Sequence, residues 1–121
     1  MSYKIHTDLD VWKESRKLVK YVYDLTAHFP KEEIYGLTNQ NRRCAISVPS
    51  NIAEGCGRNH SKDSLQFFYI SRGSLFELET QFYLAFDQNY IKESELTLVL
   101  EHITTCKKLL NGFINYYQTL K

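Results

Sequence analysis

Apolar residues recur every three or four positions along nearly the whole chain, and few residues interrupt them. The 121 residues include two prolines and five glycines, the residue types that most often end regular structure. Between the interruptions lie four segments with helical periodicity, at about residues 9–28, 33–56, 61–88 and 94–119. Long helices with short connections pack as antiparallel neighbours, so the pattern predicts an all-α fold, an up-down antiparallel four-helix bundle, with one domain over 1–121.

The second segment contains a proline within its helical pattern. Pro49 lacks a backbone N–H and its ring crowds the carbonyl of Ala45, which predicts a kink near Pro49 or a break into two helices.

The third segment carries two apolar stripes, although a helix of a single small bundle buries one. Phe68, Leu75 and Phe82 lie on the first stripe, and aromatic residues dominate the second. The chain is rich in such rings, with nine Tyr, seven Phe and one Trp. We interpret the second stripe as a subunit interface; the alternative is a set of half-exposed rings on a monomer. The candidate interface residues are Tyr69, Phe76 and Tyr83.

No pattern in the sequence specifies an active site. The three cysteines form no C-x-x-C motif, the four histidines are scattered, and the E-x-x-H pattern of di-metal bundles does not occur. We therefore expect no enzyme, no metal and no cofactor. The N-terminus has no signal-peptide core and no apolar run is long enough for a membrane, so we expect a cytoplasmic protein without a membrane partner.

A polar line follows one side of the second segment. It is either a functional groove or a structural network that repairs the hydrogen bonding around Pro49, and we favour the network. We expect Glu54 to pair with an arginine, because an unpaired carboxylate would be costly if it were buried, and the network would pair Arg43 with Glu54 or Glu77. The predicted network consists of Arg43, Ser47, Asn51, Glu54 and Glu77.

Charge is unevenly distributed although the net charge is only +1. Residues 13–58 contain eight Lys or Arg and five Asp or Glu, whereas residues 61–91 contain two Lys or Arg and four Asp or Glu. A basic patch on an oligomer could contact phosphate backbones; the alternative is an ordinary solvated face with i, i+4 ion pairs. The candidate nucleic-acid-binding residues are Lys13, Arg16, Lys17, Lys20, Arg42 and Arg58.

Four stretches carry a recognisable pattern: LDVWK (9–13), HFPKEEIYGLT (28–38), QNRRCAISVPSNIAEG (40–55) and GSLFELETQ (73–81). Together they closely resemble the four-helix bundle family of bacterial 23S rRNA intervening-sequence proteins, whose relatives include accessory variability determinants of diversity-generating retroelements.

The resemblance implies a bundle that assembles as a homopentameric barrel, and it implies no known reaction. The retroelement relatives bind a reverse transcriptase and nucleic acid through basic surfaces. The family pattern implies a structural role for Arg42, Arg43, Ser47, Pro49, Asn51, Glu54, Gly55, Gly73, Ser74 and Glu77.

The leading hypothesis is therefore a non-enzymatic, homo-oligomeric helical scaffold. Its expected partners are further copies of itself, RNA or DNA, and a reverse transcriptase or another nucleic-acid-processing protein. The alternative is a protein-interaction subunit with no nucleic-acid role.

Overall fold

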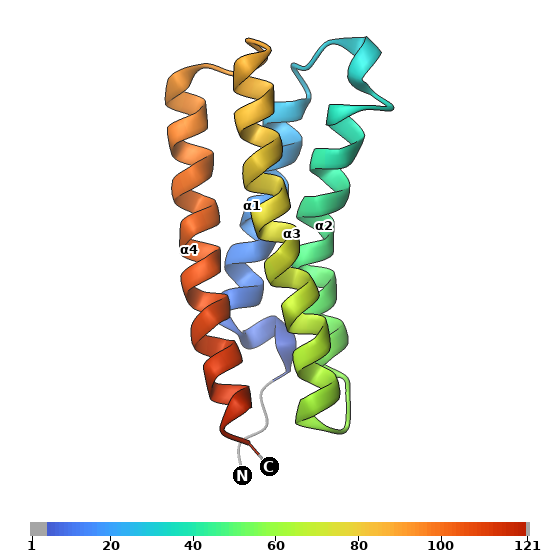
Figure 1. The fold of residues 1–121 in the computed structure, drawn as a ribbon, viewed down its shortest axis with the longest axis vertical. Helices are drawn as coiled ribbons and strands as arrows, with labels where there is room; N and C mark the ends of the chain where they lie inside the picture. The colour runs from blue at the N-terminus through green and yellow to red at the C-terminus, as the bar shows by residue number, and fades with distance from the viewer. Residues whose placement is uncertain (1–4, 121) are drawn as a thin grey trace.

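The computed structural model describes residues 5–120, which form four α-helices and two short 3₁₀ turns and contain no strand (Figure 1). The helices are α1 (Asp10–Thr26), α2 (Leu37–Cys56), α3 (Ser61–Asp87) and α4 (Glu93–Gln118), and the turns are η1 (His6–Asp8) and η2 (Lys31–Glu33). The all-α, four-helix prediction is confirmed. None of these helices is both long and apolar enough to cross a membrane.

Consecutive helices run in opposite directions and lie side by side (Figure 1). α1 and α3 each pack against α2 and α4, so α1 and α3 occupy diagonally opposite corners of the bundle. In Figure 1 α3 lies in front and α1 behind. Surfaces on the outer sides of α1 and α3 therefore face in different directions.

The core is built from the predicted apolar stripes of all four helices. Phe68 and Phe82 of α3 are its largest fully buried side chains. Phe68 packs edge-on against Tyr117 of α4, with 4.8 Å between ring centroids. The other fully buried large side chains are Leu18, Val22, Val48, Ile52, Leu75, Leu78, Val99, Ile103, Leu110 and Ile114.

α2 begins later than its apolar pattern predicts. The prediction of a helix from residue 33 is wrong, because residues 31–33 form η2 and α2 starts at Leu37. The Glu33 carboxylate explains this start: one oxygen accepts the backbone N–H of Leu37 at 3.0 Å, and the other accepts the Tyr90 hydroxyl at 2.8 Å. Glu33 thus satisfies a free N–H in the first turn of α2, and its hydrogen bond with Tyr90 joins this turn to the α3–α4 connection.

α3 ends in a motif that uses Asn89. Asn89 has φ 63°, in the left-handed region that Asn tolerates better than most residues. The N–H of Tyr90 donates to the Ala85 carbonyl and that of Asn89 to Phe86, which satisfies two free carbonyls at the helix end. The chain can then reverse into α4 within a few residues.

Candidate functional site

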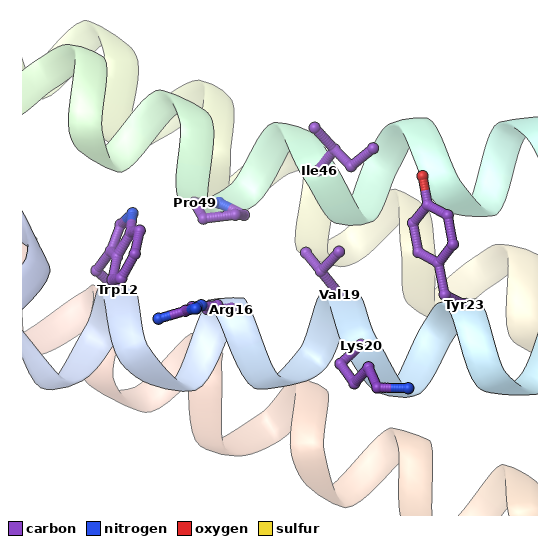
Figure 2. Close-up of a pocket in the computed structure, with 7 residues that line it drawn as sticks. All are labelled: Trp12, Arg16, Val19, Lys20, Tyr23, Ile46 and Pro49. Atoms are coloured by element: carbon purple, nitrogen blue, oxygen red, sulfur yellow. The ribbon is translucent and has the colours of Figure 1, made fainter.

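A groove of about 580 Å³ runs between α1 and α2 on the outside of the bundle (Figure 2). Figure 2 shows Trp12 and Tyr23 at its two ends, with Val19 and Ile46 between them. We call it the α1–α2 groove; its lining residues are Trp12, Arg16, Val19, Lys20, Tyr23, Ile46 and Pro49. The α1 members recur at helical spacing, so they form a second side of α1 beside the buried stripe.

Two arginines lie against the aromatic rings of this groove. The Arg16 guanidinium carbon is 5.7 Å from the Trp12 ring centroid, and that of Arg42 is 4.5 Å from the Tyr23 centroid. Arg42 also donates a 2.9 Å hydrogen bond from Nε to the Thr26 hydroxyl. Within residues 5–120 neither arginine pairs with a carboxylate. Both therefore keep an uncompensated positive charge beside an apolar surface.

The six predicted basic residues do not form one patch. Lys13, Arg16, Lys17 and Lys20 are exposed along α1, and Arg42 joins them at the Tyr23 end of the groove. Arg58 lies elsewhere: it pairs with Glu54 at 3.1 Å and stacks on Phe67 of α3, 4.5 Å from the ring centroid.

Two of the α1 lysines are already in ion pairs. Lys17 pairs with Glu14 at 3.2 Å, and Lys20 pairs with Asp24 at 2.8 Å. Exposed pairs of this kind are worth little energy, but each carboxylate reduces the charge that the lysine presents to a partner.

The predicted aromatic stripe of α3 is exposed over most of its length. Phe76 and Tyr83 are 54% and 49% exposed. Tyr69 is partly buried, and its hydroxyl accepts a 3.0 Å hydrogen bond from the Gln118 amide. Exposed Ile70 and Leu84 extend the surface, although the heptad pattern did not single them out. We call this surface the α3 ridge; its exposed members are Ile70, Gly73, Phe76, Glu77, Thr80, Tyr83, Leu84 and Asp87.

The polar residues around Pro49 form a smaller network than predicted. The Asn51 amide donates to the carbonyl of Ser47 at 2.8 Å and to its hydroxyl at 2.9 Å, and the Ser74 hydroxyl donates to Ser47 at 2.9 Å. α2 is continuous through Pro49, so it does not break into two helices there. A kink at this point stays a prediction.

The charged members of the predicted network lie on the outside. The Glu54 side chain is 54% exposed, so its charge is solvated. It does pair with an arginine, but with Arg58 one turn later rather than Arg43. Arg43 and Glu77 are also exposed, and no ion pair joins Arg43 to Glu54 or Glu77. Because these charged side chains lie on the surface, water solvates them, and they need no ion-pair partner within the chain.

The three cysteines have the properties of packed side chains. Burial raises the pKa of Cys44 and Cys56 to about 11 and that of Cys106 to about 12. Such thiols are protonated at neutral pH and are poor nucleophiles. Within residues 5–120 no three His, Cys, Asp or Glu side chains gather as a metal site would require.

Comparisons with known proteins agree with this architecture. A family model described as 23S rRNA-intervening sequence protein matches residues 7–112. The fold is similar to the crystal structure of a protein of unknown function from the S23 ribosomal protein family of Bacteroides thetaiotaomicron VPI-5482. The TM-score is 0.80 at 21% identity, over 87% of this chain and 95% of the other. A search of curated proteins found no match. The matched residues cover most of the chain, and the chain therefore belongs to the family of 23S rRNA-intervening sequence proteins.

Proposed function

We propose that this protein is a non-enzymatic subunit of a homopentameric barrel and works as a helical scaffold that contacts RNA, DNA or a nucleic-acid-processing protein such as a reverse transcriptase. The observation that carries the proposal is the α3 ridge. Its four large apolar side chains, Ile70, Phe76, Tyr83 and Leu84, are each about half exposed, although the bundle has a filled core of its own. Contiguous exposed apolar surface of this kind marks interaction sites. The resemblance described above supports five subunits.

The row of cations on α1 supports a contact with nucleic acid. Lys13 has no carboxylate partner among residues 5–120, and Lys17 presents its ammonium group on the same exposed side of the helix. In an oligomer such rows repeat, so that a phosphate backbone meets several of them at once.

The first experiment measures the molar mass of the purified protein by light scattering after size exclusion. We expect about five times the 14.3 kDa of one chain. A mass of one chain at every concentration would contradict the oligomer.

The second experiment measures binding of a structured RNA and of a single-stranded RNA by fluorescence anisotropy at about 50 and 200 mM salt. We expect affinity to fall steeply with salt. Lys13→Glu with Lys17→Glu should weaken binding at least tenfold and reduce the salt slope by about two. The control, Lys62→Glu with Lys108→Glu, changes the net charge equally at exposed positions on α3 and α4. No binding at low salt, or equal losses in both variants, would contradict a specific contact through α1.

The neutralised lysines favour a second candidate, a protein-interaction subunit with no nucleic-acid role. The Lys17–Glu14 and Lys20–Asp24 pairs and the net charge of +1 all limit the attraction to phosphates. Recovery of a protein partner that survives nuclease treatment, together with no RNA binding, would favour this candidate.

A further inference from the structure

Two exposed surfaces of the bundle carry opposite charge. The charged residues that line the α1–α2 groove are Arg16 and Lys20, and Arg42 lies over Tyr23 at its end. The charged residues of the α3 ridge are Glu77 and Asp87, and the segment 73–91 contains three Asp or Glu and no Lys or Arg. Both surfaces combine this charge with exposed apolar side chains. One is concave and cationic, and the other is an apolar, acidic helix.

We propose that the α1–α2 groove binds the α3 ridge of a second copy of this chain. This inference rests on the oligomer proposed above and adds which surfaces meet. Ridge side chains such as Phe76 and Tyr83 enter the groove between Trp12 and Tyr23, over Val19 and Ile46. Side chains of one helix that pack into the space between two others bury apolar surface on both partners.

The spacing of the charges supports this pairing. The Arg42 guanidinium contacts Tyr23 and Thr26 of α1. These two residues follow Arg16 by seven and ten positions, so the two arginines are about 10–15 Å apart along the axis of α1. Glu77 and Asp87 are ten residues apart on α3, or about 15 Å. Two arginines of one copy can therefore face two carboxylates of the next.

Two lysines near these surfaces, Lys107 and Lys20, are paired with carboxylates of the same chain and do not oppose the pairing. Lys107 lies over Phe76, with Nζ 3.8 Å from the ring centroid, but it forms a 2.9 Å ion pair with Glu79. Lys20 is held by Asp24 at 2.8 Å.

The same charges argue against contacts between identical surfaces. Two ridges would bring acidic residues together and two grooves would bring arginines together, and like charges across an interface are unfavourable. A groove-to-ridge contact is head-to-tail, because each copy uses two different surfaces. Such contacts build closed rings when the rotation between copies allows closure.

Gly73 supports a close approach at the centre of the ridge. Among residues 5–120, no atom beyond the adjacent residues and the surrounding backbone of α3 would lie within 4 Å of a Cβ at Gly73, so packing against the other helices does not require a glycine there. Glycine in a helix interior is unfavourable relative to alanine. Its place between Ile70 and Phe76 allows the backbone of another subunit to come near.

The test uses one variant for each surface and measures molar mass by light scattering. The groove variant is Ile46→Asp and the ridge variant is Phe76→Asp; both side chains are about half exposed, so the bundle should still fold, as circular dichroism would verify. We expect each variant alone to be monomeric. Mixed in equal amounts they should form a dimer and nothing larger, because one intact groove then meets one intact ridge. The matched control, Leu98→Asp, changes an equally exposed leucine on α4 and should keep the wild-type mass.

Each other outcome overturns the inference. If the groove variant keeps the wild-type mass, the groove serves another protein or a nucleic acid, and the proposed oligomer still stands. If the groove variant and the ridge variant are both monomeric and their mixture stays monomeric, the contact is not groove to ridge. If the wild type itself is monomeric, the oligomer and this inference both fail.

Charge reversal gives an independent test. Arg16→Glu with Arg42→Glu, and Glu77→Lys with Asp87→Lys, should each weaken assembly about tenfold or more. The chain with all four changes should recover most of the lost affinity, since each interface again has opposite charges. Gly73→Ala should also weaken assembly, whereas Gly112→Ala, at an open position on α4, should not. No recovery in the fourfold variant would contradict the proposed charge pairing.

Discussion

The ring of Phe68 lies directly against the backbone of Gly55, and no side chain fits between them. A Cβ at Gly55 would clash with Phe68 Cε1 and lie 2.9 Å from Phe68 Cδ1 and from the Ser64 carbonyl oxygen. The ring cannot easily move away, because it is fully buried and packs against Phe113 and Tyr117 of α4. The glycine therefore sets how closely α2 approaches α3.

We expect Gly55→Ala to lower the free energy of unfolding by about 1–3 kcal/mol, because overpacking outweighs the better helix propensity of alanine. Urea denaturation followed by circular dichroism measures this. Gly112→Ala is the control, since a Cβ there meets nothing and should raise stability by about 0.5–1 kcal/mol. Equal gains in both variants would show that the α2–α3 contact adapts to the methyl group.

Glu54→Ala should change the free energy of unfolding by less than about 0.5 kcal/mol, because its pair with Arg58 is an exposed i, i+4 pair. Ser71→Ala should cost more, about 0.5–1.5 kcal/mol, since the buried Ser71 hydroxyl donates a 2.9 Å hydrogen bond to the Val48 carbonyl. The same denaturation assay compares the two. A loss of about 1–3 kcal/mol for Glu54→Ala would instead favour the structural network predicted from the sequence.

Stability should fall in acid through Glu33. The Leu37 backbone hydrogen bond, followed by that of Tyr90, holds the pKa of Glu33 below its usual value near 4.5. A lowered pKa means that the stabilisation is present above pH 4.5 and is lost as the pH falls through the lower folded value.

We expect Glu33→Gln to lower the Tm at pH 7, with the difference from the wild type narrowing toward pH 3. Thermal melts across this range measure it. Tyr90→Phe should reproduce part of the effect, because it removes one of the two hydrogen bonds. A difference that stays constant with pH would contradict the role of the Glu33 charge.

The thiols, which are buried at Cys44 and Cys106 and partly buried at Cys56, predict a loss of stability in alkali. Burial raises the folded pKa of Cys44 and Cys56 to about 11 and that of Cys106 to about 12, and an unfolded thiol titrates at about 8.5. The folded state therefore holds its thiol protons longer, and stability should fall as the pH rises from about 9 toward 12. Thiol reagent at pH 8 should react slowly with the folded protein and quickly in urea. A fast-reacting thiol in the folded protein would contradict this prediction.

Asn41 is fully buried in α2, and neither polar atom of its amide has a hydrogen-bond partner among the described residues. An unsatisfied buried amide costs about 1–3 kcal/mol, so Asn41→Leu should raise the free energy of unfolding by a similar amount. Urea denaturation measures the change, with the isosteric Asn41→Asp as a control that should destabilise. A loss of stability in Asn41→Leu would contradict this prediction.

The sequence by itself determined the helices and their buried sides. The period of apolar residues depends only on spacing along one chain, and it placed Leu18, Phe68 and Ile103 in the core correctly. It failed where a contact between distant residues decides the outcome. The start of α2 depends on a carboxylate that is held by Tyr90, fifty-seven residues away.

The tertiary structure decided which surface residues act together. A helical pattern shows that Glu54 and Arg16 lie off the apolar stripe, but it does not show what stands beside them. Packing of α1 against α2 creates the groove that joins Arg16, Tyr23 and Ile46, and the same packing separates Arg58 from them. Spacing along a chain determines the sides of each helix, whereas a binding surface depends on which sides the bundle brings next to one another.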